Sequence, residues 1–265
     1  MKKKEAWISF FIGVAILVLW ELFAFHSKKI QFLFGSPSLI WKSLVRFSLD
    51  GSLPYDSILT ASEIVGGFLI GIFLGTLMGY ALWYSPWIAK IAYPYIFIAG
   101  VIPIFAFAPI IIIWFGIGLS MKIALAAFGT FLVSLTQAYD GAKSIPEEEY
   151  RLFKVFGANR FQLLKKVIFP AAISWVFTSL RMNIGFAILG AIVGEFIAAQ
   201  RGLGHFMFFS GSLYDIPAVF AGGIYLILLA LILNIGVIYL EDNRMKIIEF
   251  ISIDRRVRKL IKETD

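Results

Sequence analysis

Cysteine is absent from this sequence of 265 residues, which excludes disulfide bonds, zinc–thiolate centres and iron–sulfur clusters. Histidine is nearly absent: His26 and His205 are isolated and have no cluster of other ligands nearby in the sequence. We therefore expect no metal site and no cofactor. Charged residues make up only 15% of the chain, against about 25% in an ordinary soluble domain. This shortage argues against a soluble protein.

Several functional motifs are also missing. The chain has no G-x-x-x-x-G-K-[S/T] phosphate loop, so we do not expect it to hydrolyse ATP itself. An intramembrane enzyme would need paired carboxylates, a histidine cluster or a nucleophile with its base, and the scattered acids and histidines provide none. A secondary transporter or channel would need intramembrane ion ligands or inverted repeats, which are not found. That class stays the main alternative, and a structural membrane protein is another.

Long apolar runs dominate what is present, because 60% of the residues are hydrophobic. A helix that crosses a membrane needs about 20 such residues. Six runs qualify, and they cover residues 6–25, 58–84, 87–115, 121–140, 171–199 and 217–240. The runs are continuous and do not alternate with polar residues, which excludes a strand-rich barrel. We predict an all-α membrane protein with six transmembrane helices.

The basic residues indicate the orientation of these helices. If Lys2-Lys3-Lys4 is inside, the cytoplasmic segments hold Lys90, Lys143, Arg151, Lys154, Arg160, Lys165, Lys166, Arg244, Lys246, Arg255, Arg256, Arg258, Lys259 and Lys262. The outer segments hold only Lys28, Lys29, Lys42, Arg46, Lys122 and Arg201. This bias predicts that both termini are cytoplasmic, and it explains the net charge of +7 better than nucleic-acid binding does.

The N-terminal part, residues 1–57, combines a helix with an outer segment. No small-residue cleavage site follows the first run, so we expect a retained helix and not a signal peptide. Ser36-Pro37 is typical of a helix start, and Ile40, Leu44 and Phe47 follow at helical spacing. We predict a short helix at the outer membrane interface. A core, residues 58–240, and a basic cytoplasmic tail, residues 241–265, complete the chain.

Glycine recurs every fourth residue in the second run, at Gly67, Gly71, Gly75 and Gly79. Such a stripe lets the backbone of a neighbouring helix approach closely. The neighbour can belong to the same chain or to a second subunit, and the sequence leaves both open.

The third run contains Pro94, Pro103 and Pro109, each of which breaks or kinks a helix. A broken helix at membrane depth is tolerated only where protein or a water-filled cavity covers it. Pro103, Phe105 and Phe107 are therefore candidates to line a translocation pathway, with a plain structural kink as the alternative.

Charged residues inside the runs are candidates for function because they are rare at membrane depth. Glu195 is a candidate polar contact of the pathway near its outer gate; alternatively it is an interfacial carboxylate that is solvated or pairs with Arg201. Arg181 could face an anionic substrate or anchor the fifth span or a subunit contact, and Glu63 lies near an outer end.

The loop at residues 141–170 is the most informative segment. Ser144-Ile145-Pro146-Glu147 fits a capping box that starts a helix running to about Phe156. Gly157 is expected to adopt the left-handed conformation of a helix end. Asn159 is expected to cap a second short helix through Lys166, and Pro170 marks the entry to the next span. Apolar side chains along the loop, among them Phe153 and Phe161, suggest docking to a partner, or an amphipathic loop on the bilayer.

The loop resembles the EAA loop of ABC importer permeases, which reads E-A-A, three residues, glycine, nine residues, I-x-L-P. Gly157, Pro170 and their spacing match this pattern, with Val167-Ile168-Phe169-Pro170 at its end. Arg151-Leu152-Phe153 occupies the E-A-A positions, so a basic residue replaces the acidic one. The acidic residues Glu147, Glu148 and Glu149 lie just upstream.

Other segments resemble one branch of that family, the permeases for nitrate, sulfonate, taurine and bicarbonate and the related ones for pyrimidine precursors of thiamine. They are Ser36-Pro37-Ser38, Thr60 with Gly67-Phe68, Ala108-Pro109, Trp114-Phe115-Gly116-Ile117-Gly118, Gly194-Glu195 and Arg201-Gly202-Leu203-Gly204. The resemblance covers nearly the whole chain.

The resemblance implies a type I permease fold in the inner membrane of a prokaryote. It also implies a second permease copy in a homodimer, two cytoplasmic ATPase subunits and an external binding protein that delivers a small solute. The residues expected to couple the ATPase to the permease are Glu148, Arg151, Phe153, Phe156, Gly157, Ala158, Arg160 and Pro170. The substrate itself is not indicated by the sequence.

Overall fold

The computed structural model describes residues 2–146, 151, 153, 155–198 and 200–243. Within these ranges the chain is helical and contains no strand, so the predicted all-α fold is confirmed. Of the predicted tail, residues 241–265, the structure describes only residues 241–243. Glu148 of the loop also lies outside the described residues.

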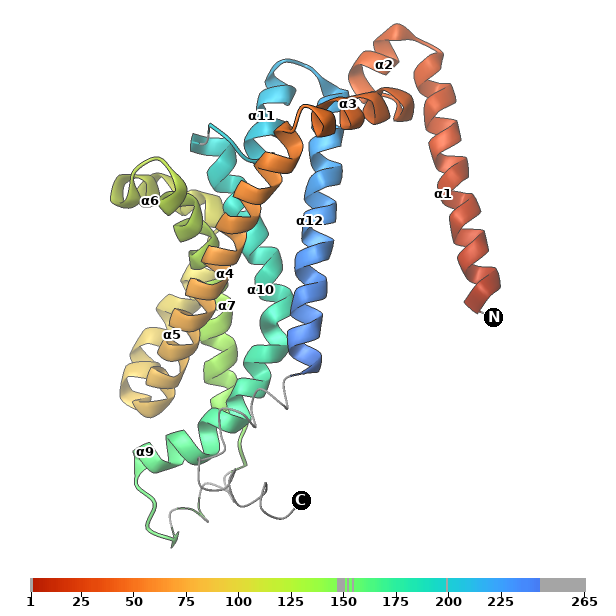
Figure 1. Cartoon of the computed structure of the whole chain (residues 1–265). Helices are drawn as coiled ribbons and strands as arrows, with labels where there is room; N and C mark the ends of the chain where they lie inside the picture. The colour runs from red at the N-terminus through yellow and green to blue at the C-terminus, as the bar shows by residue number, and fades with distance from the viewer. Residues whose placement is uncertain (1, 147–150, 152, 154, 199, 244–265) are drawn as a thin grey trace, which may run out of the picture. The chain divides into compact units, whose positions relative to one another are not determined.

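Figure 1 shows the helices of the described residues in their order along the chain. They are α1 (Lys2–Phe25), α2 (Lys28–Phe34), α3 (Pro37–Leu49), α4 (Ser52–Tyr84), α5 (Pro86–Val101), the 3₁₀ helix η1 (Ile104–Phe107), α6 (Ala108–Phe115), α7 (Leu119–Lys143), α9 (Arg160–Leu163), the π-helical η2 (Leu164–Ile168), α10 (Phe169–Ala198), α11 (Leu203–Ser212) and α12 (Ile216–Asp242).

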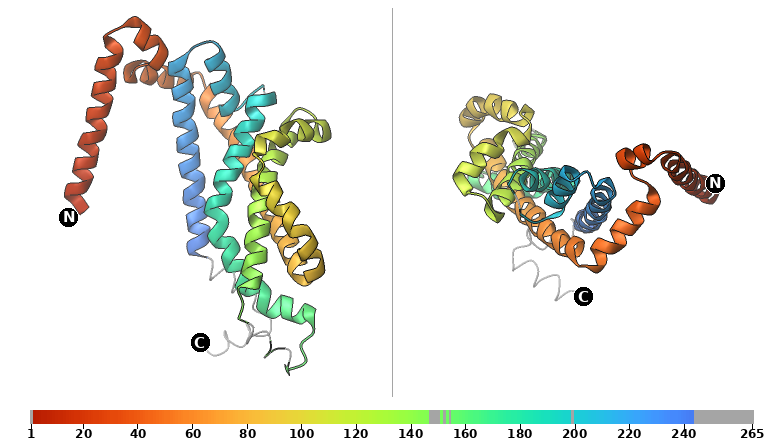
Figure 2. Two further views of the ribbon diagram at one scale, coloured as in Figure 1. Left: turned by 180° about the vertical axis from the view of Figure 1, so that it is seen from behind. Right: turned by 90° about the horizontal axis from the view of Figure 1, so that it is seen from above.

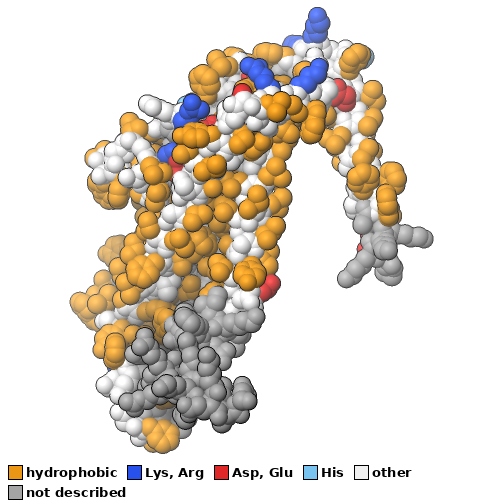
Figure 3. Space-filling model, viewed as in Figure 1, with side chains coloured by type: hydrophobic (Ala, Val, Ile, Leu, Met, Phe, Trp, Pro, Cys, Tyr) orange, Lys and Arg blue, Asp and Glu red, His pale blue; other side chains and the backbone are white. Residues whose placement is uncertain are grey.

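Five helices in the described ranges are long and apolar enough to span a membrane, and a bent pair brings the number to as many as six. The five segments are Trp7–Phe25, Ser52–Tyr84, Leu119–Lys143, Ser174–Ala198 and Ile216–Asp242. Hydrophobic side chains cover most of the helical surface in the view of Figure 3, as expected for a multi-pass membrane protein.

The bent pair replaces the span predicted over residues 87–115. α5 and the segment Ile104–Phe115 meet at an angle of 103° (Figure 2). Pro103 lies at the break, whereas Pro94 lies inside α5 without ending it, and Pro109 lies in the first turn of α6, where no N–H is needed. The sequence predicted a broken helix, but only one of its three prolines marks the break.

The contacts divide the chain into two compact units, and the first consists of residues 1–61 and 198–229. Ser36 caps α3 by accepting a hydrogen bond from the N–H of Leu39, with Pro37 in the first turn, so the predicted helix start is confirmed. The core of this unit contains Leu53 and Leu203, both fully buried. The hydroxyl of Tyr225 donates a hydrogen bond to the hydroxyl of Ser48, with the two oxygens 2.9 Å apart.

The second unit consists of residues 62–197 and 230–265. In it, α7 packs against residues 62–84 of α4 on one side and against α10 on another (Figure 1). Its cores combine small residues of α7, such as Ala138 and Ala142, with larger side chains of the neighbouring helices, such as Tyr80 and Ile168.

The glycine stripe of α4 lies against α7 of the same chain. A Cβ atom added at Gly79 would lie 2.6 Å from the carbonyl oxygen of Leu135, and one added at Gly71 would overlap Oγ1 of Thr130. From the opposite side, a Cβ at Gly190 of α10 would lie 2.6 Å from the Cα of Ala126. The backbones of α4 and α10 therefore approach α7 closely on both of its sides. The sequence left open whether the helix opposite the glycine stripe belongs to the same chain, and it does.

We expect Gly71→Leu to destabilise the fold strongly. The first side-chain carbon already collides with Thr130 and with the carbonyl oxygen of Ala127, and a backbone atom cannot rotate away. Overpacking costs about 1–3 kcal/mol and occasionally more, so purified yield and the thermal unfolding temperature in detergent should fall. Gly236→Leu in α12 is the matched control, because no atom lies within 4 Å of its Cβ position. Equal behaviour of the two variants would contradict the prediction.

Candidate functional site

The loop at residues 141–170 begins differently from the sequence prediction. Ser144 is the C-cap that follows the last residue of α7: it has helical dihedral angles, and its hydroxyl donates to the carbonyl of Gly141 at 2.8 Å. The prediction that Ser144 starts the next helix is therefore wrong, because a serine hydroxyl can bond equally well to the carbonyl three residues before it. Glu147, Glu148 and Glu149 of the predicted capping box lie outside the described residues.

The middle of the loop agrees with the sequence prediction. Arg151, Phe153 and Val155 are helical, and Gly157 has a φ of +75°, the left-handed conformation expected of it. The N–H of Ala158 donates to the carbonyl of Phe153 at 3.0 Å, which closes the helix end.

The second helix of the loop starts where predicted but does not end there. Asn159 and Gln162 form a reciprocal capping box, with N···O distances of 2.8 and 2.9 Å. The helix predicted to end at Lys166 instead continues through the π turns of η2 into α10, so that prediction is wrong. In a regular α-helix, the ring of Pro170 would meet the carbonyl of residue 166. The π turns lie at this place, and such insertions are frequent at functional sites.

One side of the loop is anchored and the other is exposed. Leu163 and Ile168 are buried, and the guanidinium of Arg160 lies over the ring of Tyr84 at 5.5 Å. By contrast, Phe156 is 79% exposed and Phe161 is 62% exposed. The loop thus presents aromatic side chains outward from a base that is packed on the helices of its unit.

The break in the α5–α6 pair borders a cavity of about 620 Å³. Pro103 and Phe105 line it, together with residues of α5, α7 and α10. Phe107 does not line it but packs against the lining residue Phe128, with ring centroids 4.5 Å apart. The remaining pathway candidate, Glu195, is not among the lining residues and is fully buried.

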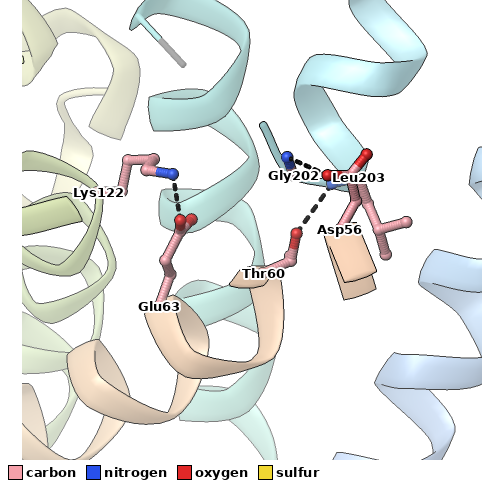
Figure 4. Close-up of polar contacts among 6 residues, drawn as sticks. All are labelled: Asp56, Thr60, Glu63, Lys122, Gly202 and Leu203. Carbon is pink, nitrogen blue, oxygen red and sulfur yellow. Dashed lines mark hydrogen bonds and ion pairs between the residues drawn. The ribbon is translucent and has the colours of Figure 1, made fainter. Parts of the chain in front are cut away.

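A buried polar cluster lies where α4, α7 and α10 meet (Figure 4). Lys122 forms an ion pair with Glu63, and Glu63 also interacts with Glu195. Both glutamates are 0% exposed and Lys122 is 7% exposed. Lys122, which the sequence places at the outer end of the run 121–140, lies one turn inside α7, where a buried carboxylate compensates its charge.

A second polar arrangement, within the first unit, was missed by the sequence analysis. The carboxylate of Asp56 accepts the N–H of Gly202 at 3.1 Å, and the hydroxyl of Thr60 accepts the N–H of Leu203 at 2.9 Å (Figure 4). Both acceptors are buried and satisfy the amides at the start of α11. The signal was present, because Asp56, Thr60 and Glu63 follow one another at helical spacing.

Two further basic side chains each have a partner within their own unit. Nε of Arg181 donates to a carboxylate oxygen of Glu241 at 2.7 Å, which joins α10 to α12. The guanidinium of Arg201 lies over the ring of Tyr55 at 5.7 Å. No group of three or more His, Asp or Glu side chains that could hold a metal is found in the part of the chain that the structure describes.

These features define a class of protein: a multi-pass helical membrane protein that has a broken span beside a cavity, and a loop in which a glycine turn joins two short helices. Residues 67–246 match the family described as binding-protein-dependent transport system inner membrane component, and the chain belongs to this family. It is a permease of the type I ABC importer class.

Individual relatives agree with this assignment. The chain is 34% identical to the riboflavin transport system permease protein RibX of Chloroflexus aurantiacus, over 83% of this chain and 82% of RibX. It is 30% identical to the taurine transport system permease protein TauC of Escherichia coli, over 71% of this chain and 68% of TauC. A chain of the MetNI methionine ABC transporter in an inward-facing conformation has a similar fold, with a TM-score of 0.57, 20% identity and coverage of 80% of this chain and 99% of that one.

Proposed function

We propose that this chain is the permease subunit of an ABC importer that moves a small solute inward across the cytoplasmic membrane of a prokaryote. A separate ATPase docks on residues 144–169, an external binding protein delivers the solute, and two copies of the chain form the translocation pathway. The observation that carries the proposal is the loop itself, with its left-handed Gly157, its exposed Phe156 and Phe161, and its buried base.

The roles of individual residues follow from these positions. Arg151, Phe153, Phe156 and Ala158 form the docking surface, where Arg151 replaces the acidic residue of the family pattern. Arg160 borders this surface, with its guanidinium over the ring of Tyr84. Pro103 and Phe105 line the pathway, Phe107 supports Phe128 in its wall, and Glu195 stabilises the junction of three helices instead of contacting solute.

Co-purification tests the proposal directly. The full chain should bring down a cytoplasmic ATPase when it is extracted from the membrane in mild detergent. Transport that continues after removal of every such ATPase would instead favour a secondary transporter or channel.

We also predict that both termini are cytoplasmic and that residues 26–57 are outside. The Lys/Arg bias motivates this orientation. Because the chain has no cysteine, single-cysteine variants report accessibility cleanly. Lys42→Cys in α3 should react with a membrane-impermeant maleimide in intact cells, whereas a cysteine appended after Asp265 should react only after permeabilisation. Labelling of the C-terminal cysteine in intact cells would reverse the predicted topology.

A further inference from the structure

The cavity beside the broken span has the size and lining of a site for a flat organic molecule. Its volume of about 620 Å³ lies within the range of about 300–1,000 Å³ that is typical of small-molecule pockets. Four phenylalanines contribute to its wall: Phe97, Phe105, Phe128 and Phe186. Thr136 supplies the one side-chain hydroxyl, and no charged residue or histidine is among the lining residues that the structure describes.

The break at Pro103 removes a backbone hydrogen-bond donor beside this apolar wall. In a regular helix the carbonyl of Ala99 would accept from residue 103, but Pro103 has no N–H. Ala99, Gly100 and Val101 all line the cavity and belong to the last turn of α5. The carbonyls of a last helical turn lack donors within the helix and carry the partial negative charge of its dipole. They favour a ligand that brings N–H donors.

The surroundings disfavour an anion. The faces of aromatic rings are negative, and burying an anion without a cation or donors is costly. Two basic side chains of helices that contribute to the wall are already paired, Arg181 with Glu241 and Lys122 with Glu63. Neither basic residue lines the cavity. A sulfonate or nitrate ion would therefore find no positively charged partner in this wall.

We propose that the solute of this permease is a flat nitrogen heterocycle with N–H donors, neutral or cationic, which stacks on the phenylalanines of the cavity and donates to the carbonyl end of α5. This excludes small inorganic anions and sulfonates from the substrate class. The inference rests on the proposed function, since it takes the cavity as part of the translocation pathway.

Protection of a single cysteine from alkylation tests the proposal. Val133 is half-buried and lines the cavity, so Val133→Cys in the full chain, purified with its ATPase, places one thiol there. Riboflavin and 4-aminopyrimidine serve as heterocyclic probes, and taurine and nitrate serve as anionic ones. At least one heterocycle should slow the reaction with N-ethylmaleimide at least threefold, whereas taurine and nitrate should leave it unchanged. Val18→Cys in α1, outside the cavity, should show no protection by any probe.

A second substitution checks the stacking. Phe128→Ala added to Val133→Cys should abolish the protection, whereas Phe115→Ala should retain it, because Phe115 is exposed and does not line the cavity. Protection by taurine or nitrate alone, or by none of the four probes, would overturn the inference. The amount of ATPase retained in the same samples reports separately on the proposed function, so the two can fail independently.

Discussion

Gly157→Val should abolish productive coupling while leaving the membrane-embedded fold intact. The φ of Gly157 is +75°, and no atom lies within 4 Å of its Cβ position, so the effect acts through the backbone alone. A left-handed conformation costs a residue with a Cβ roughly 1–2 kcal/mol, and β-branched residues tolerate it poorly. The turn should therefore open and displace the helix that starts at Arg160 from the one that contains Phe153.

The measurement is ATPase co-purification and binding-protein-stimulated ATP hydrolysis and uptake in reconstituted vesicles. We expect normal insertion, weaker ATPase association and at least a tenfold loss of uptake. Gly157→Asn should be much milder, because asparagine tolerates the left-handed region. Gly51→Val is the matched control: Gly51 has a φ of +80°, also without neighbours, but lies outside the loop. Unchanged coupling in Gly157→Val would remove the loop as the coupling element.

Lys122→Met should be the most destabilising substitution in the polar cluster. It leaves the carboxylate of Glu63, which is 0% exposed, without the cation that pairs with it. Removing one partner of a buried ion pair typically costs about 3–5 kcal/mol, which corresponds to a fall in Tm on the order of 10 °C for a chain of this size. Thermal unfolding of the purified protein in detergent measures this change.

The double variant Glu63→Gln/Lys122→Met separates charge from packing. It removes both partners of the ion pair at once. Replacing a whole buried ion pair by apolar or neutral side chains often changes the folding stability little. Its Tm should therefore lie nearer to that of the unaltered protein than the Tm of Lys122→Met does. Lys42→Met, at an exposed lysine of α3, should have no effect. If the double variant were as unstable as the single one, the cost would come from packing and not from an uncompensated charge.

The sequence predicted those features that depend on local backbone chemistry. Ser36-Pro37 marks a helix start, Asn159 caps the second loop helix, and Gly157 takes a left-handed conformation, because each depends on residues within one turn. The four-residue glycine spacing likewise predicted close helix packing. Its partner, α7, could not be read from the stripe, since spacing on one helix does not identify the helix opposite.

The features that depend on distant contacts were not predictable in the same way. Lys122 stands at the outer end of a predicted run, and only the folded chain brings it to Glu63. Ser144 matches a capping pattern, yet its hydroxyl bonds backward to Gly141. The π turns before Pro170 have no signature in the residues around them. Among three prolines, the break falls at Pro103, although each removes the same backbone donor.

α9, η2 and α10 follow one another without a gap, so the second helix of the loop and the span form one continuous helical segment. α10 has 30 residues, and a helix of that length measures about 45 Å. A tilt of roughly 5° at the loop would therefore move the far end by about 4 Å, on the scale of a helix turn. That end holds Glu195, which is buried and interacts with Glu63 of α4. If an ATPase pushes on the loop as proposed, one continuous helix would carry the motion to the contact between α10 and α4.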